Sequence, residues 1–279
     1  MKHPIEILEH YWGFSEFKPQ QEAIIEAVLT NDDCIALLPT GGGKSVCFQI
    51  PALLKKGICI VVSPLIALMQ DQVNTLKEKG IKAMALTSGL SYEDVDRMLD
   101  NCIFGNYKFL YLSPERLQQD LVQKRIKEMN VNLIAVDEAH CISQWGHDFR
   151  PAYRSIKFIR TLHPNVSVIG LTASATAKVV EDICVQLDCI APQIFKTSFH
   201  RPNLAYLTLD CEDKYFKTVQ ILKKYEDLYQ IDNSNMPIDI QFLIDNDEIK
   251  ISNKIQHSLY LLQQKINSPV LKEKKVCPN

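Results

Sequence analysis

The residues with the clearest chemistry lie in a glycine-rich loop at residues 39–45, which reads Pro-Thr-Gly-Gly-Gly-Lys-Ser. An apolar run at residues 34–38 precedes the loop, and a segment that can start a helix follows it. Glycines let the backbone turn tightly, so that several N–H groups and the positive end of the helix can point at one anion. The sequence therefore predicts a phosphate cradle. Its expected members are Thr40, Gly41, Gly42, Gly43, Lys44 and Ser45.

Two polar side chains at the end of this loop suit specific tasks in phosphate chemistry. Lys44 can reach the terminal phosphates, and the Ser45 hydroxyl can ligate Mg²⁺. The full phosphate-loop pattern asks for glycine where Leu38 stands, so the pattern is missed by one residue. An ordinary glycine-rich turn before a helix is the alternative, although such a turn gains nothing from the Lys-Ser pair.

A second group of reactive side chains follows an apolar run at residues 133–136. Asp137 and Glu138 are adjacent carboxylates, of which the first can hold Mg²⁺ and the second can orient or deprotonate the water that attacks a γ-phosphate. His140 could sense the phosphate and report it to neighbouring elements. The alternative for an Asp-Glu pair at the end of a strand is a helix cap. Its position far from Lys44, with apolar runs between them, favours the catalytic interpretation.

An aromatic segment comes directly after these carboxylates. Trp145 and Phe149 offer faces on which unpaired bases can stack, worth about 1–3 kcal/mol per base, while His147 and Arg150 can contact phosphate. Because the segment follows Glu138, contact with a nucleic acid could rearrange the catalytic residues. The alternative is that the two aromatic rings only fill a core.

A third group precedes the glycine-rich loop. Pro19 suits the first turn of a helix that runs to about residue 29, which would leave Phe14 and Gln21 close to the loop. An aromatic ring and an amide can stack on and pair with a purine. Core packing of Phe14 and a solvent-exposed Gln21 form the alternative.

The elements that must position these residues follow from the hydrophobic pattern. Runs rich in Ile, Val and Leu alternate with helical patterns from about residue 33 to residue 210, as is typical of strands buried on both faces. Beyond the first run, we expect strands at residues 58–63, 82–87, 108–113, 132–137 and 166–172, with helices that start near residues 64, 91, 114, 151 and 176. The pattern predicts an α/β fold with a doubly wound, mostly parallel sheet and a ligand site at the carboxyl ends of its strands.

Composition limits the class of protein. The chain of 279 residues is 46% hydrophobic, has nine cysteines without a close pair, and carries a net charge of −2. We expect reduced thiols, a cytoplasmic protein without a membrane partner, and nucleic-acid binding through a local patch only. Lysines 223–224 and 272–275 are interpreted as solvated faces.

The motifs together resemble those of a known family. Residues 41–45, 137–140 and 174–176 look like motifs I, II and III of superfamily 2 helicases, and residues 141–151 resemble the aromatic-rich loop of RecQ helicases. Further segments similar to that family are residues 17–21, 63–65, 70–72 and 198–204, and the resemblance covers about residues 5–224. It implies a RecA-like domain, an ATP-dependent 3′→5′ helicase and ATPase that acts on single-stranded and forked DNA, and a role in DNA repair and recombination, nucleoid-associated in a bacterium.

The same resemblance implies roles for single residues. It suggests that Phe14, Lys18 and Gln21 hold adenine, and it assigns Ser174 and Thr176 to DNA contact and coupling. Helix capping is the alternative for these two hydroxyls. The sequence departs from the family at Lys18, where arginine is usual, which could weaken the adenine contacts. It also departs at Gln20, where glycine is common, and at His200, where aspartate is usual.

The sequence changes character after residue 224. No glycine follows Gly170 and no arginine follows Arg201. We expect an ATP-binding domain at residues 1–210, a helix and linker at residues 211–235, and an extension at residues 236–279 that is either small α+β, with a hairpin and a helix, or partly disordered.

An arginine that faces the phosphates from a second motor domain is worth about 10³–10⁵ in kcat. We therefore expect a chain that is weakly active alone and that could receive the second motor domain in trans. The alternative function is a nucleotide-gated adaptor that binds DNA or protein with little catalysis.

Overall fold

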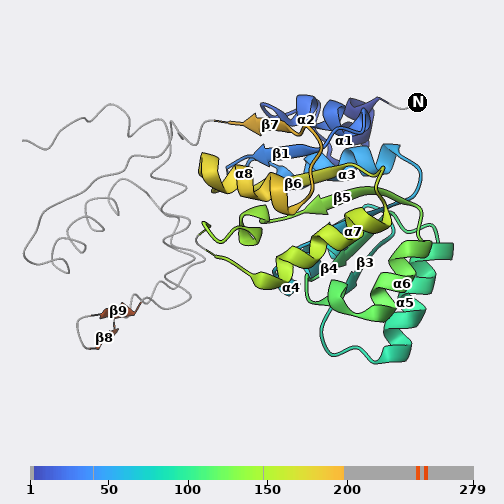
Figure 1. Ribbon diagram of the computed structural model, residues 1–279. Helices are drawn as coiled ribbons and strands as arrows, with labels where there is room; N and C mark the ends of the chain where they lie inside the picture. The colour runs from blue at the N-terminus through green and yellow to red at the C-terminus, as the bar shows by residue number, and fades with distance from the viewer. Residues whose placement is uncertain (1–2, 40, 147, 198–242, 246–247, 251–279) are drawn as a thin grey trace, which may run out of the picture. The chain divides into compact units, whose positions relative to one another are not determined.

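A seven-stranded sheet forms the centre of the first of two compact units, Met1–Phe199 and His200–Asn279. The computed structural model describes residues 3–39, 41–146, 148–197, 243–245 and 248–250 (Figure 1). Two expected site residues, Thr40 and His147, lie outside these ranges. So do residues 198–242 and 251–279, with the family-like segment at 198–204, the lysine runs and the helix expected in the extension.

All strands of the sheet run parallel, in the order β3-β4-β2-β5-β6-β1-β7 (Figure 1). The strands are β1 (Cys34–Leu37), β2 (Ile58–Val62), β3 (Ala83–Leu86), β4 (Phe109–Leu112), β5 (Val131–Val136), β6 (Val168–Thr172) and β7 (Gln193–Lys196). Their carboxyl ends therefore share one edge. This confirms the expected α/β fold with a doubly wound, parallel sheet.

Helices connect successive strands of the sheet and precede the first one. The α-helices are α1 (Pro4–Trp12), α2 (Gln21–Leu29), α3 (Lys44–Leu54), α4 (Ile66–Glu78), α5 (Tyr92–Phe104), α6 (Asp120–Glu128), α7 (Lys157–Leu162) and α8 (Ala177–Gln186). Three short 3₁₀ helices are η1 (Arg116–Gln118), η2 (Ala139–Ile142) and η3 (Pro151–Ile156). Two of these, η2 and η3, flank the aromatic segment.

Both faces of the sheet are covered, because its strands are apolar on both sides. One face packs against α2, α3 and α4 through a core that includes Ile24, Phe48 and Val73. The other face packs against α5 to α8 through a core that includes Leu99 and Ile126. Helix α1 packs on α2 and α3 in a separate small cluster. The core therefore lies in two layers, one on each side of the sheet.

The expected strands correspond to β1–β6 within about two residues at each end. One strand, β7, was not predicted, because three of its four residues are exposed and it forms no apolar run. The helix expected from Pro19 begins instead at Gln21. Gln20 has a φ of 70°, a left-handed conformation that a right-handed helix excludes and that glycine adopts without strain. This explains physically why glycine suits position 20.

The described part of the second unit is a pair of antiparallel strands, β8 (Leu243–Asp245) and β9 (Glu248–Lys250). They lie where the sequence predicts a hairpin. Among the described residues, no helix is long and apolar enough to cross a membrane.

A buried carboxylate ties four segments of the first unit together at the amino ends of the strands. Asp33 is 3% exposed and accepts two hydrogen bonds of 3.0 Å from the Arg160 guanidinium. It also accepts bonds from the backbone N–H groups of Val168 at 2.8 Å and of Ile190 at 2.7 Å. Asp33 therefore connects the start of β1 with α7, with the start of β6 and with the turn before β7.

Replacement of Asp33 by asparagine should reduce the free energy of unfolding by about 3–5 kcal/mol, because a buried Arg160 would lose its charged partner. Urea unfolding of both chains measures the difference. Asp188→Asn provides a matched control, because Asp188 pairs at 3.4 Å with Lys157 while both side chains are more than half exposed. That control should lose about 0–1 kcal/mol. Equal losses in the two variants would contradict a special role for Asp33.

Candidate active site

Three neighbouring strands, β5, β6 and β1, carry the expected nucleotide residues at their carboxyl ends. Strand β1 leads into the glycine-rich loop, and Lys44 is the first residue of α3. Strand β5 leads into Asp137, and β6 ends at Thr172. Because these strands lie side by side and parallel, residues from distant parts of the sequence meet at one edge of the sheet.

The glycine-rich loop is held from outside by two side chains, one from the segment before α2 and one from the first residue of α2. The Lys18 ammonium donates to the Gly41 carbonyl at 2.8 Å, and the Gln21 amide donates to the Gly43 carbonyl at 3.0 Å. Gly43 has a φ of 75°, and a Cβ at this position would collide with the Gln21 amide. Glycine is thus required at position 43 both by conformation and by close approach.

The structure decides the alternative for Gln21 and leaves Phe14 at the surface. Gln21 is 3% exposed, so the alternative of a solvated amide is wrong. Phe14 is 59% exposed, so the alternative of core packing is wrong for this ring. The Lys18 backbone N–H donates to the side-chain amide oxygen Oε1 of Gln21 at 2.9 Å. Lys18 and Gln21 therefore hold the glycine-rich loop by hydrogen bonds, while the nearby ring of Phe14 is exposed to solvent.

Asp137 is a nearly buried carboxylate, with 8% exposure. Burial is the main cause that raises its pKa, and the neighbouring Glu138 raises it further. The Glu138 N–H, the Lys44 ammonium and the Ser63 hydroxyl oppose this shift. Ser63 follows β2 and donates to the Asp137 carboxylate at 3.5 Å. These surroundings disfavour the ionised carboxylate and favour a cation beside it.

Glu138 and His140 connect the end of β5 with the end of β6. Glu138 has a φ of 46°, in the left-handed region that only a few per cent of non-glycine residues adopt. His140 Nδ1 lies 3.3 Å from Glu138 Oε2 and 2.9 Å from Thr172 Oγ1. The Thr172 hydroxyl in turn accepts a bond of 3.2 Å from the Ser174 N–H. A continuous polar path therefore joins the two strand ends.

The aromatic segment projects from this region toward solvent. Trp145 is 63% exposed, so the alternative that it fills a core is wrong, while Phe149 is half-buried. The Lys178 ammonium, from α8, lies 3.1 Å from the centroid of the Trp145 ring. Arg150 donates to the Pro64 carbonyl and to the Asp148 carboxylate, both at 3.3 Å. The segment is thus in contact with the residues that precede α4 and with α8.

Tyr153 is a positioning residue that the sequence did not signal. Its side chain is fully buried, and its hydroxyl donates to the Asp137 carbonyl at 3.0 Å. The Arg150 N–H donates to the Cys141 carbonyl at 2.8 Å and closes the base of the aromatic segment. Thr172 and Ser63 were given no role of their own, although each ends or follows an expected strand and Ser63 belongs to the family-like segment at residues 63–65.

The two hydroxyl residues after β6 have different surroundings. Thr176 is the N-cap of α8, where its side chain accepts a bond of 3.4 Å from the Val179 N–H. The capping alternative therefore holds for Thr176. Ser174 contributes backbone groups to the path from Thr172, and its expected contact with DNA stays a prediction, as does that of Thr176.

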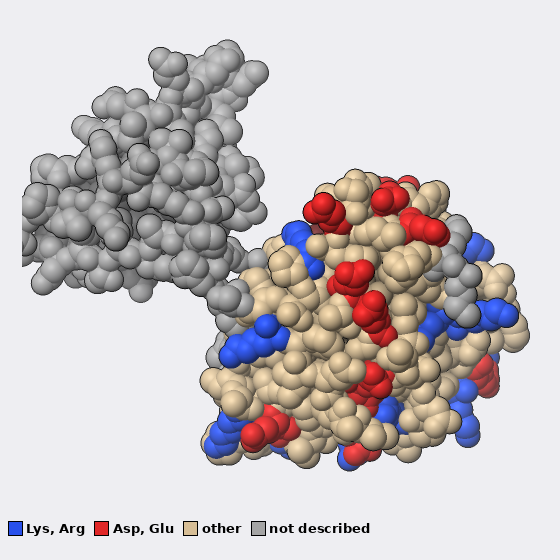
Figure 2. Space-filling model, turned by 90° about the horizontal axis from the view of Figure 1, so that it is seen from above, with Lys and Arg blue, Asp and Glu red and all other residues tan. Residues whose placement is uncertain are grey.

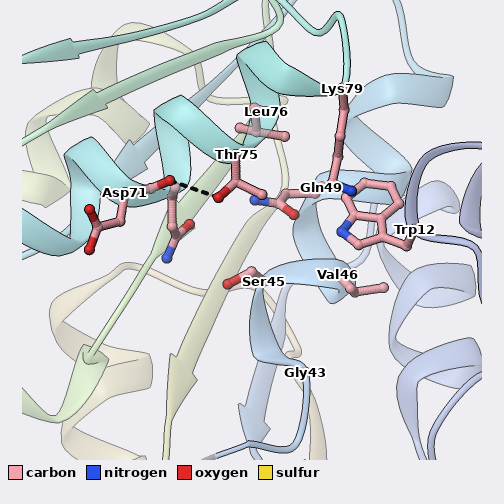
Figure 3. Close-up of a pocket in the computed structure, with 10 residues that line it drawn as sticks. Trp12, Gly43, Ser45, Val46, Gln49, Asp71, Thr75, Leu76 and Lys79 are labelled. Atoms are coloured by element: carbon pink, nitrogen blue, oxygen red, sulfur yellow. Dashed lines mark hydrogen bonds between the residues drawn. The ribbon is translucent and has the colours of Figure 1, made fainter. Parts of the chain in front are cut away.

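A cleft of about 230 Å³ lies between α3 and α4, beside the glycine-rich loop (Figure 3). Ser45 and Val46 of α3 form one wall, and Asp71 and Thr75 of α4 form the opposite wall. Trp12 lies at one end of the cleft (Figure 3). The cleft thus begins at the residue expected to ligate Mg²⁺ and runs between the two helices.

The donor set fits Mg²⁺. This ion prefers oxygen ligands, which a carboxylate and a hydroxyl supply. Asp137 and Ser45 would hold it, with the Ser63 hydroxyl beside the carboxylate. A bound cation would offset the cost of burying the Asp137 charge, which is the cost that raises its pKa.

Replacement of Asp137 by asparagine should stabilise the ligand-free chain at about pH 7. Because its pKa is raised in the folded chain, the wild type loses stability as pH rises from the ordinary value of 3.8 through the raised pKa. The asparagine variant has no such loss. Urea unfolding of both chains between about pH 3 and about pH 8 measures the difference.

Two further measurements test whether ionisation of Asp137 causes this difference in stability. Mg²⁺ should raise the stability of the wild type and leave Asp137→Asn unchanged, whereas the exposed Asp188→Asn control should respond to Mg²⁺ like the wild type. A gain from Asp137→Asn that persists unchanged below the ordinary pKa of an aspartate would contradict an origin in ionisation.

Comparison with solved structures shows the fold. The chain is similar to a hypothetical ATP-dependent RNA helicase from Sulfolobus tokodaii, with a TM-score of 0.56 and 19% identity, over 80% of this chain and 66% of that one. It is also similar to the DUF1998 helicase MrfA bound to DNA and AMPPNP, with a TM-score of 0.55 and 16% identity, over 71% of this chain and 29% of that one. The first unit is therefore a RecA-like helicase domain in fold.

Comparison of sequences gives closer relatives. The chain is 43% identical to the ATP-dependent DNA helicase RecQ of Bacillus subtilis over 210 residues, 75% of this chain and 36% of that protein. It is 41% identical to the probable ATP-dependent DNA helicase RecS of the same organism, over 79% of this chain and 44% of that protein. The chain thus spans less than half the length of these relatives. The model of the DEAD/DEAH box helicase family matches residues 18–183, more than half of the sequence, so the chain belongs to the DEAD/DEAH box helicase family.

Proposed function

We propose that this chain is the first motor domain of a RecQ-type, ATP-dependent DNA helicase that moves 3′→5′ and binds ATP·Mg²⁺ and single-stranded DNA. The observation that carries the proposal is the meeting of the glycine-rich loop, Asp137 and His140 at the adjacent ends of β1, β5 and β6. The likeness to RecQ helicases over about three quarters of the chain supports the choice of DNA as substrate.

The nucleotide would lie along the glycine-rich loop. The positive end of α3 and the Lys44 ammonium bind its phosphates. Ser45 and Asp137 hold Mg²⁺, which neutralises charge that develops on the phosphates when it is bound. Lys18 and Gln21 fix the carbonyls of the loop, and the exposed ring of Phe14 is available to stack on adenine. Because Lys18 and Gln21 are engaged with the loop, the adenine base would be recognised mainly by stacking on Phe14.

Glu138 would orient the attacking water or accept its proton. Its backbone lies in the left-handed region, and such strained positions cluster at functional sites. His140 contacts both the carboxylate of Glu138 and the hydroxyl of Thr172. A rearrangement of Glu138 at the γ-phosphate would therefore be transmitted from the end of β5 to the end of β6 through this one histidine. The residues after β6 then transmit the state of the nucleotide to the start of α8.

DNA would bind at the aromatic segment and not through a general field. The net charge is −2, and the face shown in Figure 2 carries acidic and basic side chains together. Trp145 offers an exposed ring for a base, which must either displace the Lys178 ammonium or use the opposite face of the ring. Arg150, at the base of the segment, lies close enough to the surface to meet a phosphate.

ATP hydrolysis tests the proposal directly. The purified chain should hydrolyse ATP slowly, single-stranded DNA should stimulate this rate, and Lys44→Ala should abolish both. Because no arginine follows Arg201, the kcat of the chain alone should be lower by a factor of about 10³–10⁵ than that of an enzyme with such an arginine, and the chain should not unwind duplexes processively.

Three outcomes would contradict parts of the proposal. Tight nucleotide binding without DNA-stimulated turnover would instead support the adaptor, and greater stimulation by RNA than by DNA would contradict the choice of substrate. Processive unwinding by this chain would contradict the need for a second domain.

Trp145→Ala tests the coupling between DNA and the carboxylates. It should lower DNA affinity by about 1–3 kcal/mol per lost stacked base and should remove most of the DNA stimulation. The ATPase rate without DNA should stay at the wild-type level. Phe104→Ala is the matched control, since Phe104 is an aromatic residue of 79% exposure at the end of α5 and should leave stimulation intact. Unchanged stimulation in Trp145→Ala at saturating DNA would refute the coupling.

A further inference from the structure

A second and larger hollow lies near the amino ends of β2, β3 and β4, away from the edge that carries the glycine-rich loop. Its volume is about 980 Å³. It is lined by the start of α1, the end of α2, the last turn of α3 and the segments that lead into the three strands. Small-molecule sites range from about 300 to 1,000 Å³, so the hollow is large enough for an organic ligand.

The charges around the hollow have one sign. Four lysines line it, Lys55, Lys56, Lys82 and Lys108, together with His3. Among its described lining residues none is Asp or Glu. The four lysines also take part in none of the ion pairs that the described residues form. This is a concentration of positive charge on a chain whose net charge is −2.

Neutral oxygen atoms hold three of the ammonium groups. Lys108 donates to the Lys55 carbonyl at 2.7 Å, and Lys55 donates to the Val28 carbonyl at 2.7 Å. Lys82 donates to the Gly105 carbonyl at 3.0 Å. Burial lowers the pKa of both Lys55 and Lys108, which means that their charges have lost hydration without gaining a carboxylate. Capping of the ends of α3 and α5 explains Lys108 and Lys82, because Gly105 is the C-cap of α5, and it leaves the exposed Lys56 unexplained.

Apart from Asn106, the rest of the lining offers no polar side chain except the Tyr11 hydroxyl, and most of it is apolar. Ile7 and Tyr11 of α1, Leu29 of α2, and Leu53 of α3 contribute to it, with Ile81 before β3. A phosphodiester backbone or a bare inorganic ion would make no favourable contact with these apolar side chains. A small molecule with an apolar body and more than one negative charge could pack on the apolar side chains and bind the lysines at the same time.

We propose that this hollow is a binding site for an organic phosphate, whose phosphate meets the lysines and whose aliphatic or aromatic body lies on the apolar floor. The proposal does not depend on the function proposed above, because no residue of the nucleotide or DNA site lines the hollow.

Isothermal titration calorimetry with the full chain tests the site, using decyl phosphate below its micellar concentration, AMP and inorganic pyrophosphate as probes. All titrations use the chain with Lys44→Ala, which removes the ammonium expected to bind phosphate at the glycine-rich loop and does not alter the lining of the hollow. We expect one decyl phosphate or one AMP per chain. The tighter of the two tells whether an aliphatic or an aromatic body is preferred. Pyrophosphate should bind more weakly than either.

Lys56→Glu with Lys82→Glu should weaken this binding about tenfold or more, since like charges would then face the ligand. Lys56→Gln with Lys82→Gln should weaken it to an intermediate degree and guards against misfolding of the double glutamate variant. The matched control is Lys124→Glu with Lys127→Glu, an equal charge reversal on two exposed lysines of α6, and it should bind like the wild type.

Three results would overturn the proposal. They are the absence of saturable binding to decyl phosphate and AMP, equal weakening in the hollow and control variants, and pyrophosphate binding as tight as that of the organic probes.

Discussion

The parallel arrangement of seven strands is the constraint on which the rest of the structure depends. Parallel strands need crossover connections, so helices cover both faces and every strand in the middle of the sheet is buried. The same arrangement places all carboxyl ends at one edge and all amino ends at the other. The polar residues of the candidate site therefore collect at the ends of the strands. Lys44, Asp137 and Thr172 lie at the carboxyl edge, while Asp33 and Lys108 lie toward the amino edge.

Helix α3 runs between these two edges, and its carboxyl end has polar partners while its amino end faces the place proposed for the phosphates. Its first residue, Lys44, follows the glycine-rich loop, so the positive end of the helix faces the place of the phosphates. At its other end the carbonyl of Ala52 accepts from the Asn132 amide at 3.1 Å, and that of Lys55 accepts from the Lys108 ammonium at 2.7 Å. A cation at the negative end and an anion at the positive end both stabilise the helix dipole. Charges bound at the two edges therefore act on the same helix.

The sequence predicts the elements that are buried on both faces, and it does not predict the elements and residues whose roles depend on tertiary contacts. The strands β1–β6 were found because a strand buried on both faces reads as an unbroken apolar run. Strand β7 was missed because its exposed residues Gln193, Ile194 and Lys196 form no such run, and only pairing with β1 makes it a strand. The loop and the carboxylates were recognised because each is a local pattern. Tyr153 and Thr172 were not, because their roles rest on a partner that the fold brings near.

The contacts of the aromatic segment provide two routes by which the proposed coupling would act on the proposed nucleotide site. On one side, Tyr153 follows the segment and binds the carbonyl of Asp137, so displacement of the segment pulls on the backbone of the expected metal ligand. On the other side, Lys178 covers the ring of Trp145 and belongs to the first turn of α8. A base that displaces this ammonium frees α8 from the segment. Since α8 begins shortly after the path from His140 through Thr172, the two routes would reach Glu138 from both sides, one through Asp137 and the other through His140.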